Sequence, residues 1–260
     1  MKNYYDSPRA ASEYLLFHYG DPQLRPPAGW SDSAALPFPA RCVQQCLDTA
    51  RLPGKARALD LGCAVGRASF ELARYCAEVV GIDFSRRFIA LANRLRRDGE
   101  VKYRTFEEGR LTRERRAAVP RGIDRQRVRF EAGDATDLRR DLGQFEAVLM
   151  LNLIDRLAAP AECLERVAGL VRPGGQLIIA SPYTWLADYT PRRRWLGGFV
   201  RRGRPVGTLD TFRRLLVAHF DLAARLDVPW LLREHARKYQ LGVSEATVWI
   251  RREQKPAKGI

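Results

Sequence analysis

A glycine-containing turn between a short apolar run and a helical segment constrains the fold of this chain more than any other feature. Residues 57–66 read Arg-Ala-Leu-Asp-Leu-Gly-Cys-Ala-Val-Gly, and the apolar start of this run predicts a buried parallel strand. Gly62 and Gly66 bracket a turn, and residues 67–75 then have the spacing of a helix. Such a strand, turn and helix bring bare backbone against a ligand at the helix N-terminus.

Two carboxylates accompany this turn. Asp60 precedes it, and an acid there suits a cationic ligand group better than a phosphate. About twenty residues further on, the run 79–83 predicts a second strand that ends in Asp83, where a carboxylate can accept from both hydroxyls of a ribose. The NAD-type fingerprint G-x-G-x-x-G is absent, because Cys63-Ala64-Val65 follows Gly62. The alternative is a glycine turn in some other α/β protein.

This pair of motifs resembles the S-adenosylmethionine (SAM)-dependent methyltransferases, whose first motif is an acid followed by glycines at alternate positions. Asp60, Gly62 and Gly66 match, whereas Ala64 stands where the family usually has its middle glycine. The resemblance implies a Rossmann-like α/β fold of class I with a seven-stranded sheet. It also implies SAM as cofactor, S-adenosylhomocysteine (SAH) as product and no metal.

The rest of the chain follows the same succession of elements. Apolar runs predict further strands at 128–134, 145–152, 176–181 and 222–226, and helical spacing predicts helices at 12–19, 41–51, 86–97, 160–170 and 209–220. In that fold, 244–251 would be the last strand, inserted antiparallel. Residues 98–127 exceed what a plain connection requires and predict an insertion after the helix of the second strand. We expect an N-terminal helical extension (1–56, with an ordered proline-rich loop at 22–39) before the methyltransferase domain (57–260).

The positive charge of the chain leaves two interpretations open. The net charge is +15, and 15 Lys/Arg face 6 Asp/Glu between Arg86 and Arg129. Solvated helix faces explain this surplus, whereas a phosphate-binding surface would have more aromatic residues interleaved for stacking. We therefore favour solvated faces over a nucleic-acid-binding surface, and an RNA methyltransferase with a basic binding surface is the competing function.

The apolar segments and the cysteines of the chain indicate its cellular compartment. No apolar run approaches the roughly 20 residues of a membrane span, and the first residues lack the apolar region of a signal peptide. We expect a cytoplasmic protein that does not contact a membrane. Five scattered cysteines lack the paired spacing of a zinc site, which favours reduced core thiols.

The methyltransferase resemblance also implies the cofactor-binding residues. Asp60 and the glycine turn would hold the methionine end of SAM, and Asp83 would accept from the ribose hydroxyls. An aromatic side chain would pack on the adenine and a third strand-end acid would read its edge. As an alternative, each acid could be a surface cap. The expected cofactor site comprises Asp60, Gly62, Cys63, Gly66, Asp83, Phe84, Asp134, Ala135 and Asn152.

The acceptor site is expected beside the cofactor, at the ends of the central strands. Asn152 follows the most hydrophobic strand, and an aromatic wall at 183–185 suits a flat heterocycle. The run 192–198 could fold over the pocket as a lid. The helix at 12–19 is aromatic enough to cover the pocket, although packing against the sheet would also explain it. We expect Asn152, Tyr183 and His18 to be catalytic, His18 by orienting a thiolate or taking a proton, and the substrate to touch Tyr14, Tyr19, Tyr183 and Trp185.

A closer resemblance covers nearly the whole chain. The segments 13–20, 38–42, 59–67, 81–85, 107–112 and 181–185 look like the C-terminal methyltransferase domain of ovothiol biosynthesis proteins, a family that includes mercaptohistidine N-methyltransferases. The implied reaction moves the SAM methyl to a ring nitrogen of 5-thiohistidine, which a separate iron-dependent sulfoxide synthase would have to supply. The ring demands no strong base, so positioning should dominate. A SAM-binding regulatory partner without catalysis is the remaining alternative.

Overall fold

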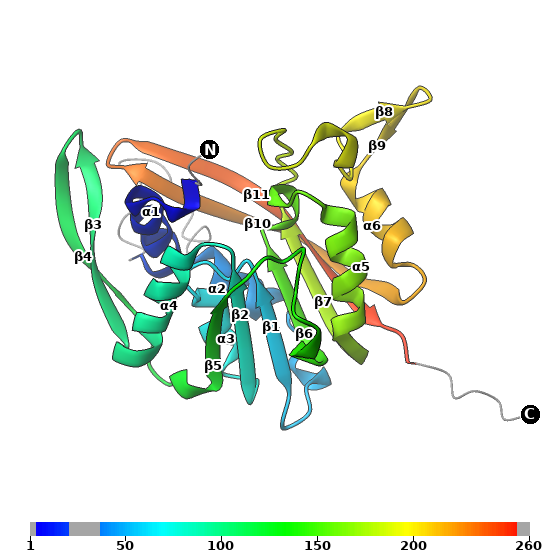
Figure 1. Cartoon of the computed structure of the whole chain (residues 1–260), viewed down its shortest axis with the longest axis horizontal. Coiled ribbons are helices and arrows are strands. Elements are labelled where there is room, and N and C mark those ends of the chain that lie inside the picture. The colour runs from blue at the N-terminus through cyan, green and yellow to red at the C-terminus, as the bar shows by residue number, and fades with distance from the viewer. Residues whose placement is uncertain (1–3, 21–36, 254–260) are drawn as a thin grey trace, which may run out of the picture.

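The computed structural model describes residues 4–20 and 37–253, and a seven-stranded sheet forms its centre (Figure 1). The strands lie in the order β10-β11-β7-β6-β1-β2-β5. All neighbours run parallel except β11, which pairs antiparallel with both β7 and β10. The doubly wound sheet and its antiparallel last strand are therefore confirmed. The strands are β1 (Arg57–Leu61), β2 (Glu78–Asp83), β5 (Val128–Ala132), β6 (Phe145–Leu151), β7 (Val171–Ser181), β10 (Phe220–His235) and β11 (Lys238–Arg251).

Helices cover both faces of this sheet, because its strands are apolar on both sides. In β1, Ala58 packs into the core under one set of helices, whereas Leu59 and Leu61 pack into the core under the other set. The first set comprises α1 (Pro8–Tyr19), α2 (Phe38–Cys46), α3 (Arg67–Leu72) and α4 (Arg86–Asp98). The second set comprises α5 (Pro160–Leu170) and α6 (Thr208–Leu216).

Local capping explains where the helices begin and end. The Ser85 hydroxyl accepts from the Phe88 amide at 3.1 Å and starts α4, as the sequence predicts. The helix predicted over 12–19 begins four residues earlier, because Ser7 caps it and Pro8 occupies its first turn. The helix predicted over 41–51 is wrong in its second half. It stops at Cys46, since the Asp48 amide donates instead to the Gln176 side chain at 2.9 Å, and only a short 3₁₀ turn, η3 (Thr49–Arg51), follows.

The predicted insertion is an antiparallel hairpin of β3 (Glu100–Glu108) and β4 (Leu111–Ala118), which lies beside α1 (Figure 1). On the other side of α1, β10 and β11 extend beyond the sheet as a two-stranded arm, which we call the β10–β11 arm (residues 229–243). The Ser12 hydroxyl donates to the Arg104 carbonyl, and Arg233 of the arm pairs with Glu107 of the hairpin at 2.7 Å. The hairpin and the arm therefore hold α1 between them.

The remaining short elements lie at the opposite end of the sheet or in its connections. Phe199–Arg201 (β8) and Arg204–Val206 (β9) form a small hairpin, and 3₁₀ turns include η1 (Tyr4–Asp6), η4 (Arg125–Arg127), η5 (Arg140–Leu142), η6 (Ile154–Arg156) and η7 (Arg192–Arg194). All five cysteines are buried and unpaired. No helix within the described ranges is long and apolar enough to cross a membrane. Residues 22–36 of the expected proline-rich loop lie outside the described residues.

Candidate active site

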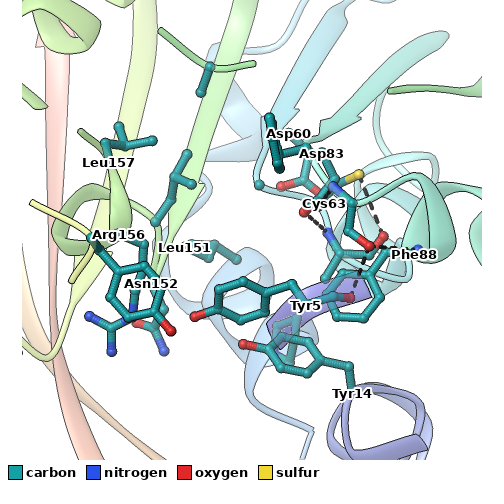
Figure 2. Close-up of a pocket in the computed structure, with 18 of the residues that line it drawn as sticks. Tyr5, Tyr14, Asp60, Cys63, Asp83, Phe88, Leu151, Asn152, Arg156 and Leu157 are labelled. Atoms are coloured by element: carbon teal, nitrogen blue, oxygen red, sulfur yellow. Dashed lines mark hydrogen bonds between the residues drawn. The ribbon is translucent and has the colours of Figure 1, made fainter. Parts of the chain in front are cut away.

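A cavity of about 650 Å³ lies at the carboxyl ends of β1, β2, β5 and β6, where an open parallel sheet binds its ligands. Its polar half consists of strand ends and the loops that follow them. Its aromatic half consists of η1, α1, the start of α2 and the β10–β11 arm. Figure 2 shows Asp60 and Asp83 on one side of this space and Asn152 and Arg156 on the other, with the rings of Tyr5 and Tyr14 between them.

The two predicted carboxylates both line the cavity, and neighbouring groups orient them. Asp60 is 1% exposed and accepts from the Ser69 hydroxyl at 2.6 Å. Asp83 accepts from the backbone amides of Ala64, at 2.9 Å, and Ser85, at 2.8 Å. Burial raises the pKa of Asp60 to about 7 and that of Asp83 to about 6. A cationic ligand that binds beside these carboxylates would therefore favour their ionised form.

The glycine turn adopts left-handed backbone at several positions. Gly62 has φ +72°, and its amide and that of Cys63 donate to the Ile82 carbonyl at 2.8 and 3.1 Å. Gly66 has φ +85° at the start of α3, and a Cβ there would lie 2.4 Å from the Phe130 ring. Gly62 and Cys63 line the cavity, whereas Gly66 is outside its lining and shapes the turn from behind.

Ala64, the departure from the methyltransferase motif, is also left-handed, with φ +48°. We expect Ala64→Gly to raise the free energy of unfolding by about 0.5–1 kcal/mol. A left-handed non-glycine residue costs about 1–2 kcal/mol, and the larger loss of backbone entropy when a glycine folds offsets part of the gain from removing that cost. Equilibrium urea unfolding measures the change. Ala68→Gly, in the right-handed helix α3, should instead lower stability, and a loss of stability in both variants would contradict the argument.

The residues predicted at the adenine end also reach the cavity. Phe84 is 64% exposed beside Asp83, so an aromatic face is open to a flat ring. Asp134 is exposed, and its Oδ1 accepts from the amide and hydroxyl of Thr136 at 2.8 and 2.7 Å. Ala135 is buried in the same wall. Their contacts with a cofactor remain predictions.

Asn152 lies in the cavity wall between the two halves. It has φ +52°, a conformation that asparagine tolerates better than most residues. Its Oδ1 accepts from the Ser244 hydroxyl at 2.7 Å, and that hydroxyl accepts from the Trp230 indole at 3.0 Å. The amide oxygen is thus committed to the protein, and the amino group is the part of Asn152 left to meet a ligand.

His18 lines the aromatic half of the cavity and is 5% exposed. Its Nδ1 is buried and has no hydrogen-bond partner among the residues that the structure describes. Burial, with a smaller contribution from Arg67, lowers the pKa of His18 to about 3, so the imidazole is neutral at physiological pH. Of the two roles predicted for it, this favours orienting a substrate over taking its proton. Tyr14, one helical turn earlier, also lines the cavity.

Three of the predicted substrate contacts lie elsewhere. The Tyr183 hydroxyl donates to Glu245 at 2.5 Å, and its ring packs against Phe212 rather than lining the cavity. Trp185 is 8% exposed and donates to the Thr208 hydroxyl at 3.0 Å, because the backbone after β7 turns it into the core under α6. Tyr19 donates to the Val65 carbonyl at 2.8 Å and anchors α1 on the glycine turn.

The expected lid at 192–198 is also placed differently. None of its residues lines the cavity; Leu196 is buried, and the Trp195 indole donates to the Thr190 carbonyl at 2.8 Å. The segment just before it lines the cavity instead, through Leu186, Asp188 and Tyr189.

Sequence reasoning missed the residues that complete the acceptor side. Arg156 follows Asn152 by four residues in the same loop, a position that could have singled it out. Tyr5 lies in η1, and nothing in its sequence context places it against the sheet. The lining residues that sequence reasoning did not name include Tyr5, Phe88, Leu153, Arg156 and Tyr189.

Comparison with known proteins agrees with this architecture. Residues 59–179 match the protein family described as a methyltransferase domain. The solved structure of magnesium protoporphyrin IX methyltransferase from Synechocystis PCC 6803 with bound SAH superposes with a TM-score of 0.56 at 17% identity, covering 95% of this chain and 96% of that one. The chain therefore has the Rossmann-like fold of the class I SAM methyltransferases, as the motifs predict.

Curated relatives are similar to part of this chain. The ubiquinone biosynthesis O-methyltransferase of Alkalilimnicola ehrlichii is 32% identical over 54% of this chain and 45% of its own length. The enzyme of the same description from Aromatoleum aromaticum is 29% identical over 51% of this chain and 46% of its own length. The chain thus spans about half the length of these relatives, and the similarity says nothing specific about a thiohistidine acceptor.

Proposed function

We propose that this protein transfers the methyl group of SAM to a ring nitrogen of 5-thiohistidine and releases SAH and the N-methylated product. The observation that carries the methyl-transfer part is the cavity, which combines three strand-end carboxylates with an aromatic chamber. SAM carries a sulfonium and an ammonium group, and Asp60 suits such cations. Asp83 suits the ribose hydroxyls, and the exposed ring of Phe84 suits the face of the adenine.

The chamber supports a small flat acceptor. The rings of Tyr5, Tyr14 and Trp230 and the neutral imidazole of His18 line it, and α1 covers it. In-line transfer requires the nucleophile within about 3–3.5 Å of the methyl carbon with its lone pair free. As the ring nitrogen forms its bond to that carbon, the carbon–sulfur bond breaks and its electrons stay on the SAH sulfur. The donor group of Asn152 and the unpartnered Nδ1 of His18 can orient a polar ring for this step.

Methylation of a phenol oxygen is the second candidate, and the ubiquinone biosynthesis relatives favour it. A phenol must lose its proton during transfer, so that reaction benefits from a base with a pKa near the working pH. His18, the imidazole of the chamber, has a pKa of about 3 and is a weak base, and the carboxylates with a pKa near the working pH, Asp60 and Asp83, are the groups proposed to hold the cofactor. A thiolate-conjugated imidazole needs no such base, which supports the nitrogen acceptor.

The deciding experiment incubates the protein with SAM carrying a deuterated methyl group and analyses the products by mass spectrometry. We expect one labelled methyl on 5-thiohistidine, assigned to a ring nitrogen by fragmentation. A dihydroxybenzoate, histidine and total RNA serve as competing acceptors. Labelling of the dihydroxybenzoate alone would establish the phenol reaction, and labelling of RNA with steep salt dependence would establish the nucleic-acid alternative. SAM binding without any transfer would indicate the regulatory partner.

The origin of the substrate is a further part of this proposal. Thiohistidine must be made from histidine by an oxidative carbon–sulfur bond-forming enzyme, and we expect a separate iron-dependent sulfoxide synthase to do so. Supplying that enzyme with its substrates in the same mixture should yield the labelled methyl product without added thiohistidine.

A further inference from the structure

Arg156 is the only positively charged side chain among the described residues that line the cavity. The other charged residues of the lining are Asp60, Asp83, Asp134 and Asp188. Figure 2 shows Arg156 across the cavity from Asp60 and Asp83, on the side of Asn152, with the Tyr5 ring between the two groups. Asp60, Asp83 and Asp134 therefore make the strand-end side of the cavity negative, and Arg156 is the positive group of the other side, where Asp188 also lines the cavity next to Tyr189.

The protein fixes the Arg156 guanidinium by one of its nitrogens. Nη1 donates to Asp155 Oδ2 at 2.8 Å, to the Asp155 carbonyl at 3.0 Å and to the Thr184 carbonyl at 2.8 Å. The Tyr189 ring lies 5.1 Å from the guanidinium carbon. These three bonds all leave from Nη1, so none of them uses the edge formed by Nε and Nη2, and the Tyr5 hydroxyl is a further hydrogen-bonding partner of Arg156. An oriented guanidinium with such an edge suits a carboxylate, which it can bind through two parallel hydrogen bonds.

The Asp155 carboxylate holds this arrangement in place. Asp155 is fully buried, and besides Arg156 it accepts from the Ser181 hydroxyl at 3.2 Å and the Thr184 amide at 3.0 Å. Its lone pairs are thus committed to the loops that follow β6 and β7. Arg156 is therefore held at the ends of the central strands, with 23% of its side chain exposed.

Two hydroxyls face the same place. In Figure 2 the Tyr5 and Tyr14 hydroxyls point toward the side of the cavity that holds Arg156. Burial raises the pKa of Tyr5 to about 12, against the opposing effect of Arg156, and raises the pKa of Tyr14 well above its usual range. Both groups therefore stay protonated and can donate hydrogen bonds to an anion.

We propose that Arg156, with the hydroxyls of Tyr5 and Tyr14, binds a carboxylate of the acceptor, so that the enzyme selects heterocyclic acids over neutral heterocycles. The proposal rests on methyl transfer as the proposed function and names the substrate class for the same cavity. SAM also carries a carboxylate, and the experiment therefore separates binding of the cofactor from recognition of the acceptor.

The test compares 5-thiohistidine with 5-thiohistamine, which lacks the carboxylate, in the wild type, Arg156→Met and Arg156→Lys. We expect Arg156→Met to lower kcat/KM for 5-thiohistidine by about 10- to 100-fold, mainly through KM, because hydrogen bonds between charged groups are among the strongest. The thiohistamine reaction and the Kd for SAH should change less than about threefold, and Arg156→Lys should restore part of the loss. Arg194→Met, which removes a surface arginine paired with Glu162 at 3.3 Å, is the control.

Two results would overturn the proposal: an equal loss with both acceptors, or a tenfold weaker Kd for SAH with unchanged preference between acceptors. If the wild type methylates neither compound, the proposed acceptor is wrong, and a binding experiment without turnover then tests the carboxylate site. Calorimetry on the SAH-loaded protein then compares imidazole-4-propionate and 4-hydroxybenzoate with their amides. A preference for the acids that Arg156→Met abolishes supports the carboxylate site, whereas equal binding or no binding of the acids contradicts it.

Discussion

The affinity of this protein for SAM is expected to fall about tenfold between pH 8 and pH 6, because burial raises the pKa of Asp60 to about 7. Only the ionised carboxylate attracts the cationic methionine end, and at pH 6 about one Asp60 in ten is ionised. The sign follows from the raised pKa: affinity rises with pH through 7. Asp83, with a pKa of about 6, should add a second loss below pH 6.

Titration calorimetry with SAM and SAH at pH 6, 7 and 8 measures this dependence. We expect Asp60→Asn to weaken binding at pH 8 by about 10- to 100-fold and to remove most of the dependence between pH 6 and 8, since hydrogen bonds to charged groups contribute about 1.5–3 kcal/mol. Asp134→Asn is the matched control, because Asp134 is exposed and should leave the pH dependence in place. Wild-type binding that is constant across this range would show that Asp60 does not meet the cation.

Replacing Asn152 with alanine is expected to lower kcat by about 100-fold while the Kd for SAH stays within about threefold, because a preorganised donor at a reaction centre contributes on that order. The Ser244 hydroxyl holds the Asn152 oxygen, so the remaining amino group is oriented before the substrate arrives. Steady-state kinetics on the methyl acceptor, together with calorimetry for SAH, separate the two effects.

Two variants sharpen this test. Ser244→Ala keeps Asn152 but frees its amide to rotate, and it should produce an intermediate loss. Tyr183→Phe removes a hydroxyl that donates to Glu245 outside the cavity, and it should leave kcat near the wild-type value. If Asn152→Ala turns over normally, or if Tyr183→Phe is the more damaging change, the acceptor does not bind as proposed.

The cofactor half of the cavity could be predicted from sequence because its information is local. Asp60 lies in β1 and Gly62 directly follows the end of that strand, so one short segment places both. Strand ends in a parallel sheet meet at one edge, so Asp83 and Asp134 follow from their positions at the ends of predicted strands. Even the conformation of Ala64 follows from the motif, which usually has glycine there.

The acceptor half could not be predicted in the same way, because it depends on how distant segments pack. Trp185 follows a strand as an acceptor residue should, but its indole finds a partner in Thr208, and this turns it into the core. The Tyr183 hydroxyl donates to Glu245 of the antiparallel strand β11, and this bond holds the side chain away from the cavity. Arg156 sits in the cavity because buried Asp155 holds it, and the sequence gives no sign of that burial.

The separate origins of the two halves bear on how such enzymes diverge. One continuous stretch, residues 60–136, supplies the donor side, whereas η1, α1 and the β10–β11 arm bring much of the acceptor side from the two outer parts of the chain. The match to the methyltransferase family covers residues 59–179 and so omits those outer parts. Substitutions in them can change which compound is methylated without altering how the methyl donor is held. Relatives that agree closely in the matched region can therefore differ in the metabolite they modify. We expect a change of specificity to involve substitutions in the first helix and the arm.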